Sequence, residues 1–98
     1  MAITTDTTRY LDVANNDVVA VSGTSAQSNA FAGPEIQLVS TTDCWLKFGT
    51  NPTAVANTDG NQYFPAGAIW TIQWKAGDKV AVIQNAAGGY LVCTSVEM

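Results

Sequence analysis

The residues of this 98-residue chain that could perform chemistry do not combine into a catalytic set. Histidine is absent, which excludes a Ser-His-Asp or Cys-His arrangement. The cysteines, Cys44 and Cys93, are far apart in the sequence and have no C-x-x-C spacing, so a zinc site is not indicated. Asp43, Asp59 and Asp78 stand at expected turns, where aspartate commonly caps backbone N–H groups. We therefore expect no enzymatic activity, no metal and no cofactor.

The segment NTDGN at 57–61 is the best candidate for a metal-binding loop. Asn57, Asp59 and Asn61 alternate around Gly60, as ligands do at the start of a calcium-binding loop. The first-position aspartate and the glutamate at position twelve are missing, however. A polar turn is the favoured interpretation, and Asn57 and Asn61 are candidates for contact with a partner.

The three tryptophans are the remaining candidates for binding. Trp70 and Trp74 share one face of an expected strand at 68–74, so we expect them in the core or in a subunit interface. Trp45 alternates with Cys44 and is expected to be more exposed, as an interface anchor. Stacking of these aromatic rings on sugars, as in a carbohydrate-binding module, is the alternative.

The elements that position these side chains are short segments in which apolar and polar residues alternate, separated by turn residues. This pattern predicts an all-β fold. The sequence ANN at 14–16 predicts a turn, and the short TTD join at 41–43 predicts a hairpin. No segment has the 3.6-residue period of a helix. The expected strands are 10–14, 17–23, 35–41, 44–49, 68–74, 79–84 and 90–97.

The long polar segment 47–67 is expected to be a crossover between two sheets. Gly67 in Pro65-Ala66-Gly67 is suited to a type II turn, because glycine adopts a positive φ at no steric cost. Phe64 is expected to fix the base of this segment to the core. The predicted architecture is a single antiparallel β-sandwich, jelly-roll-like, over residues 9–98.

The charge of the chain excludes two classes of partner. A net charge of −4 with scattered cations provides no basic stripe for nucleic acid or for an anionic membrane; these cations are Arg9, Lys47, Lys75 and Lys79. Only 12% of the residues are charged, about half the usual share, which indicates a surface that packs against other chains. No signal peptide or membrane span is indicated, so Cys44 and Cys93 are expected to be buried thiols rather than a disulfide.

The segment 41–98 resembles small structural proteins encoded near the head genes of tailed bacteriophages. The resemblance is carried by the runs DCWLKFG, NPTA, PAG and GDKVAVIQ, and by the final strand. It implies a capsid decoration or cement protein on the exterior of the virion, assembled in the host cytoplasm. It brings no catalytic residues. A head-fibre, collar or tail component remains an alternative.

The same resemblance implies two partners, the major capsid protein and the chain itself, as a dimer or trimer at a symmetry axis. The Thr-rich residues 1–8 are expected to form a flexible N-terminal arm that orders on the shell, with a frayed terminus as the alternative. Its expected contacts are Thr4 and Thr5, with Arg9 and Tyr10 at its base.

Overall fold

A computed structural model describes residues 10–97, which form eight β-strands and no helix. None of these residues belongs to a helix long and apolar enough to cross a membrane. The strands are β1 (Tyr10–Val21), β2 (Ala26–Gln27), β3 (Glu35–Ser40), β4 (Cys44–Gly49), β5 (Gln62–Phe64), β6 (Ile69–Gln73), β7 (Lys79–Gln84) and β8 (Gly89–Glu97).

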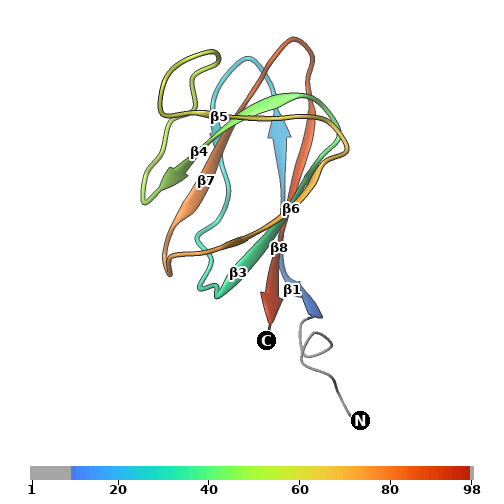
Figure 1. Cartoon of the computed structure of the whole chain (residues 1–98), viewed down its shortest axis with the longest axis vertical. Coiled ribbons are helices and arrows are strands. Elements are labelled where there is room, and N and C mark those ends of the chain that lie inside the picture. Colours follow the sequence, from blue (N-terminus) through green and yellow to red (C-terminus); the bar gives the residue numbers. More distant parts are fainter. Residues whose placement is uncertain (1–9, 98) are drawn as a thin grey trace.

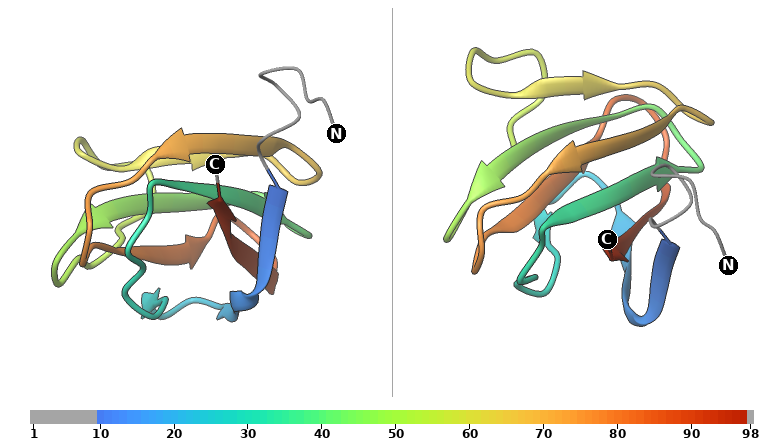
Figure 2. Two further views of the ribbon diagram at one scale, coloured as in Figure 1. Left: turned by 90° about the horizontal axis from the view of Figure 1, so that it is seen from below. Right: turned by 60° about the horizontal axis from the view of Figure 1, so that its bottom comes forward.

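The strands form two antiparallel sheets that pack against each other (Figures 1 and 2). Sheet A has the order β1-β8-β3-β6, and sheet B has the order β2-β7-β4-β5. In both sheets, odd-numbered strands alternate with even-numbered ones, and this strand order is the topology of an eight-stranded jelly roll. The predicted all-β, jelly-roll-like sandwich is therefore confirmed.

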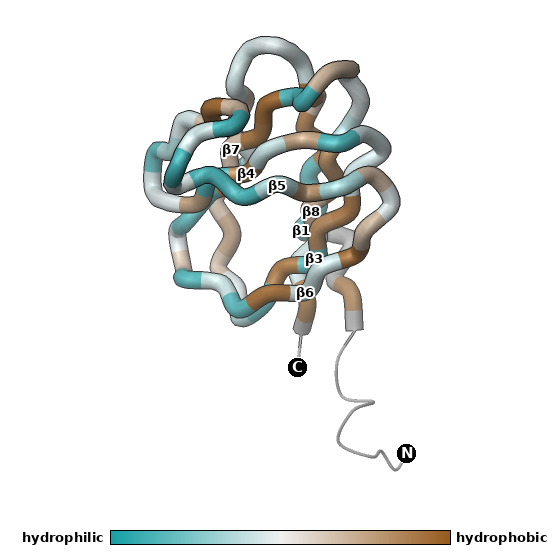
Figure 3. The backbone as a smooth tube through the Cα atoms, turned by 45° about the horizontal axis from the view of Figure 1, so that its top comes forward, coloured by the Kyte–Doolittle hydropathy of each residue, from teal (hydrophilic) through white to brown (hydrophobic). Residues whose placement is uncertain are grey.

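Alternation of apolar side chains produces the core between the two sheets. In β3, Ile36, Leu38 and Ser40 are buried and their neighbours are more exposed. Hydrophobic residues recur along the strands, and hydrophilic residues gather in turns and in the loop before β5 (Figure 3). The largest fully buried apolar side chains, from both sheets, are Ile36, Leu38, Leu46, Phe64, Val80, Val82 and Leu91.

The start of the chain differs from the prediction of two strands joined by a turn at 14–16. β1 is continuous, and both of its halves pair with β8. The register shifts between Asp12 and Asn16, so the additional residues form a β-bulge. The Asn-rich segment that predicts a turn is accommodated here as an irregularity within a strand. The Asn16 amide is held by donating a hydrogen bond to Thr94 Oγ1 at 2.9 Å.

Two predicted connections also differ in the structure, one entirely and one in part. The TTD join does not close a hairpin, because β3 belongs to sheet A and β4 to sheet B. The segment 47–67 connects sheet B to sheet A, as a crossover does, but most of it stays with sheet B, because it contains β5, which pairs with β4. Three-residue β5 is too short to show an alternating pattern in the sequence. The chain instead crosses between the sheets at the short corner from Pro65 to Ala68.

This corner contains the type II turn that the sequence predicts. Gly67 has a φ of 81°, and the Ala68 N–H donates a hydrogen bond to the Pro65 carbonyl at 3.2 Å. Phe64, directly before the turn, is 0% exposed, as predicted. The corner is therefore fixed at its base by a core side chain.

Candidate interaction surface

A row of β-branched side chains crosses the outer face of sheet A. Val18 of β1 is opposite Val92 of β8, Val92 is opposite Val39 of β3, and Val39 is opposite Ile69 of β6. Val18 is 54% exposed and Ile69 is 64% exposed, and the two central valines are half-buried. The row therefore exposes apolar surface from one edge of the sheet to the other.

The rows on both sides of it are uncharged as well. One contains Asn16, Gln37, Thr71 and the buried Thr94, and the other contains Ala20 and Tyr90, of which Tyr90 is 56% exposed. We call these ten residues the sheet A surface: Asn16, Val18, Ala20, Gln37, Val39, Ile69, Thr71, Tyr90, Val92 and Thr94. The row that follows, toward the end of β8, contains the charged Glu35.

The outer face of sheet B is different, because a loop covers part of it. Ala81 shares this face with Gln27 and Lys47, yet it is 0% exposed. The Gln27 amide donates hydrogen bonds to Asn51 Oδ1 at 2.8 Å and to the Pro52 carbonyl at 2.7 Å. The loop of residues 50–61 therefore lies over sheet B.

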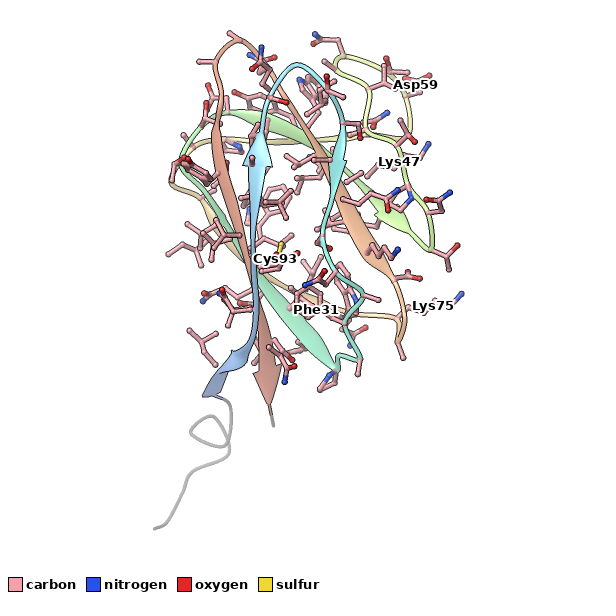
Figure 4. The ribbon with its side chains drawn as sticks, turned by 180° about the vertical axis from the view of Figure 1, so that it is seen from behind. Phe31, Lys47, Asp59, Lys75 and Cys93 are labelled. Carbon is pink, nitrogen blue, oxygen red and sulfur yellow. The ribbon has the colours of Figure 1, made fainter. Side chains whose placement is uncertain are left out.

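Several charged side chains lie on the sheet B side of the molecule. Lys47 and Lys79 are on β4 and β7, and Asp59 is on the covering loop. Figure 4 shows Lys47, Asp59 and Lys75 pointing outward on the side of β4, β7 and the loop, with Cys93 between the sheets. Among the described residues, the sheet A surface is thus uncharged up to the row that contains Glu35, whereas the opposite face carries several charges.

Trp45, the expected anchor, lies on the sheet B side and is half-buried. Its indole Nε1 donates a hydrogen bond to Asn85 Oδ1 at 3.0 Å, and its ring meets that of Tyr63 edge-on at 5.3 Å. Removal from water, together with a hydrogen bond to Asp43, raises the pKa of Tyr63. Trp70 and Trp74 pack against the core, as expected.

The two asparagines expected to contact a partner lie in the loop that covers sheet B. Asn57 is exposed and has a φ of 54°, a left-handed conformation that asparagine tolerates. Asn61 is engaged within the loop, where its Oδ1 accepts the Val55 N–H at 2.9 Å. Both are therefore on the opposite side of the molecule from the sheet A surface.

The structure does not bring the remaining predicted contact residues together with Asn57 and Asn61. Thr4, Thr5 and Arg9 lie outside the described residues, and Tyr10 begins β1 opposite Glu97. The sheet A surface was missed in the sequence because its residues come from four strands that are distant along the chain. Alternation places Val39 and Ile69 on outward faces, but it does not show that they are neighbours.

Both cysteines are free and buried, which confirms the prediction of thiols. Burial raises the pKa of Cys44, and it raises the pKa of Cys93 to about 12. Because the thiolate is the nucleophile, neither cysteine is suited to covalent chemistry at neutral pH. The described residues also contain no group of three potential metal ligands and enclose no pocket.

Comparisons with known proteins bear on the fold alone. No family model matches the chain, and no curated protein sequence is significantly similar to it. Among solved structures, it is similar to one described as "Crystal Structure of Fe(II)-HppE with alternative substrate (S)-1-HPP", with a TM-score of 0.52 and 15% identity. The match covers 82% of this chain and 40% of the other, so this chain spans less than half of that protein's length.

This likeness shows a shared fold alone and carries no activity over to the chain; the jelly-roll class rests on the strand order described above. Fe(II) in non-haem oxygenases is commonly held by two histidines and a carboxylate. The present sequence has no histidine and cannot form that ligand set. The feature that distinguishes the described surface is the uncharged face of sheet A.

Proposed function

We propose that the chain is a structural protein that decorates the exterior of a bacteriophage capsid and bridges neighbouring major capsid proteins. It acts by binding and performs no catalysis. The observation that carries the proposal is the sheet A surface, ten uncharged side chains on one sheet face, of which only Thr94 is buried. Exposed apolar surface of this kind is typical of an interaction site. The resemblance of residues 41–98 to phage head-associated proteins supports the identity of the partner.

The charge distribution supports a defined orientation on the shell. Uncharged side chains lose less hydration free energy when they are covered than charged ones, which lose a great deal unless they are paired. Sheet A would therefore face the shell, and sheet B with Lys47, Lys79 and Asp59 would face solvent. The charged side then keeps the decorated particle soluble.

The size of the surface supports a role based on many copies. With strands about 4.8 Å apart and residue pairs rising about 6.7 Å, the surface covers roughly 300 Å². A stable interface needs about 800 Å² on each partner, so one copy would bind weakly. Repetition over a lattice, where a chain contacts two capsid proteins at once, compensates for weak single contacts.

Co-sedimentation with purified heads of the phage that encodes the chain tests this proposal. The wild-type chain should pellet with heads that lack it and increase their resistance to heat and osmotic shock. Ile69→Asp, which places a charge on the valine–isoleucine row, should weaken this binding at least about ten-fold, since an unpaired charge is costly to bury. Val55→Asp is the matched control, because Val55 is apolar and 47% exposed on the opposite side.

A wild-type chain that remains in the supernatant and leaves the heads as fragile as before would contradict the proposal. A head-fibre, collar or tail location would use the same surface, and a reconstruction of the intact particle would show it.

The Trp45–Tyr63 ring pair favours a second candidate, a carbohydrate-binding module for adsorption. That candidate predicts a change of tryptophan fluorescence on addition of host polysaccharide, lost in Trp45→Ala.

A further inference from the structure

One strand at the edge of sheet A is unprotected. The four edge strands are β1 and β6 in sheet A and β2 and β5 in sheet B. β2 and β5 have two and three residues, and β1 contains a bulge. β6 has five residues, IWTIQ, without charge, proline or register shift. Natural proteins use short length, charge, proline and bulges to protect sheet edges, and β6 has none of these except its modest length.

The backbone of β6 has hydrogen-bonding groups directed away from its neighbour β3. The Trp74 N–H donates to the Pro34 carbonyl at 2.9 Å, in register with the β3–β6 ladder. Hydrogen-bonded pairs alternate along an antiparallel ladder, so Trp70 and Ile72 also bond to β3. The N–H and C=O groups of Ile69, Thr71 and Gln73 therefore point toward the open edge.

The inner side of β6 is also incompletely covered. Trp70, Ile72 and Trp74 point toward the core and pack against it, but all three are only half-buried. Large apolar side chains in this position are covered further when another strand is added beside them. The edge of β6 therefore offers both backbone hydrogen bonds and apolar surface to an additional strand.

We propose that β6 pairs antiparallel with β6 of a second copy of this chain, about a two-fold axis at Thr71. Thr71 then faces Thr71 of the other copy, and Ile69 faces its Gln73. These are the residues with outward backbone groups, and each pair exchanges two N–H···O bonds. On the inner face Trp70 is opposite Ile72 of the second copy, a favourable aromatic–β-branched pair.

The strand is complementary to itself, which favours a second copy over another partner. In this register Lys75 falls opposite Gly67 of the other copy, so no like charges meet, although each chain has a net charge of −4. Such a contact is closed and symmetric, as in most homodimers. It joins two sheet A surfaces into one of roughly 600 Å², which comes closer to the roughly 800 Å² of a standard interface than one copy does.

The test uses the purified chain alone, so its result is independent of capsid binding. Sedimentation velocity over a concentration series should show a monomer–dimer equilibrium for the wild-type chain. Thr71→Lys places two lysines directly opposite each other and should raise the dissociation constant at least about ten-fold. Gln37→Lys is the matched control, because Gln37 is opposite Thr71 in the same row but on the central strand β3. It should leave the dissociation constant unchanged.

Amide exchange measured by NMR provides a second readout on the wild-type chain, which needs no variant to fold. Exchange at Ile69, Thr71 and Gln73 should slow as the concentration rises, because their N–H groups become bonded in the dimer. A monomer at every concentration, or exchange at these amides that does not depend on concentration, would overturn the proposal. Equal weakening by Thr71→Lys and Gln37→Lys would also overturn it and indicate association through the sheet face.

Discussion

The ring of Phe64 lies against the ring of Trp70, with centroids 4.6 Å apart and planes inclined by 60°. Phe64 ends β5 in sheet B and Trp70 belongs to β6 in sheet A, so this contact joins the sheets beside the corner where the chain crosses between them. Edge-to-face pairs of this kind stabilise a core beyond the burial of their area.

Replacing the Phe64 ring should destabilise the protein strongly. Phe64→Ala removes a fully buried side chain and its contact with Trp70, and should lower the free energy of unfolding by about 3–5 kcal/mol. Phe48→Ala, at a position that is 38% exposed, should cost clearly less. Urea unfolding followed by tryptophan fluorescence measures both. Equal losses in the two variants would show that Phe64 does not have this role.

A methyl group at Gly89 should also be poorly tolerated. A Cβ there would lie 2.5 Å from Thr41 Oγ1, and Thr41 is held in place because its hydroxyl accepts the Tyr90 N–H. Gly89→Ala should therefore cost about 1–3 kcal/mol through overpacking.

Gly23→Ala is the control for this prediction, because its nearest neighbour would be a side-chain atom at 3.7 Å. Thermal unfolding of the two variants should show a clear decrease of the melting temperature for Gly89→Ala and little change for Gly23→Ala. Similar melting temperatures would contradict the close approach at Gly89.

Buried Cys93 should make the protein sensitive to alkaline pH. In the folded protein its pKa is raised from 9.0 to about 12, so above pH 9 the thiol ionises more readily in the unfolded chain. The stability that this thiol contributes is complete below pH 9 and is lost as the pH rises from 9 toward 12. The loss approaches about 1.4 kcal/mol per pH unit within that window.

Urea unfolding at several values between pH 8 and pH 11 measures this effect. Because lysines and tyrosines also titrate there, the informative quantity is the difference in slope between the wild-type chain and Cys93→Ala. The variant is expected to be less stable at pH 8 but to lose stability more slowly as the pH rises. Parallel curves would contradict a raised pKa of Cys93 in the folded state.

Asn61 should stabilise the loop that covers sheet B without binding calcium. Asn61→Ala removes the acceptor of the Val55 N–H and should lower the free energy of unfolding by about 0.5–1.5 kcal/mol. Calcium should leave the melting temperature of the wild-type chain unchanged. Asn57→Gly is the control, since glycine accepts the same positive φ. A calcium-dependent increase in melting temperature that disappears in Asp59→Ala would contradict this interpretation.

The sequence predicts faces of strands better than it predicts their partners. Alternation places Ile36 and Leu38 on the inner side of β3, and Trp70 and Ile72 on the inner side of β6, because a core needs one apolar face on each strand. Turn residues mark where a strand ends, but they do not determine which sheet the next strand enters. For that reason the TTD corner was predicted as a hairpin, and β5 was not recognised within the predicted crossover 47–67.

The sheet A surface could not be predicted from the sequence for the same reason, because it depends on the order of the strands. Val18 and Ile69 are outward-facing residues on the two edge strands, and nothing local to either residue indicates the other. Only the strand order, through Val92 and Val39, brings them into one row. The surface is created by the pairing of strands that are distant in the sequence, and no short stretch of sequence shows that pairing.

The pairing of β1 with β8 has a consequence for how the chain is made. Val18 and Val19 pair with Val92 and Leu91, which lie near the far end of the sequence. β1 therefore has no neighbouring strand until β8 has been synthesised. A ribosome must therefore synthesise nearly all of the domain before sheet A can close, and the closure of so long a segment slows folding. Nascent chains that stop before β8 should accordingly remain sensitive to protease, and their exposed β1 would be a target for chaperones.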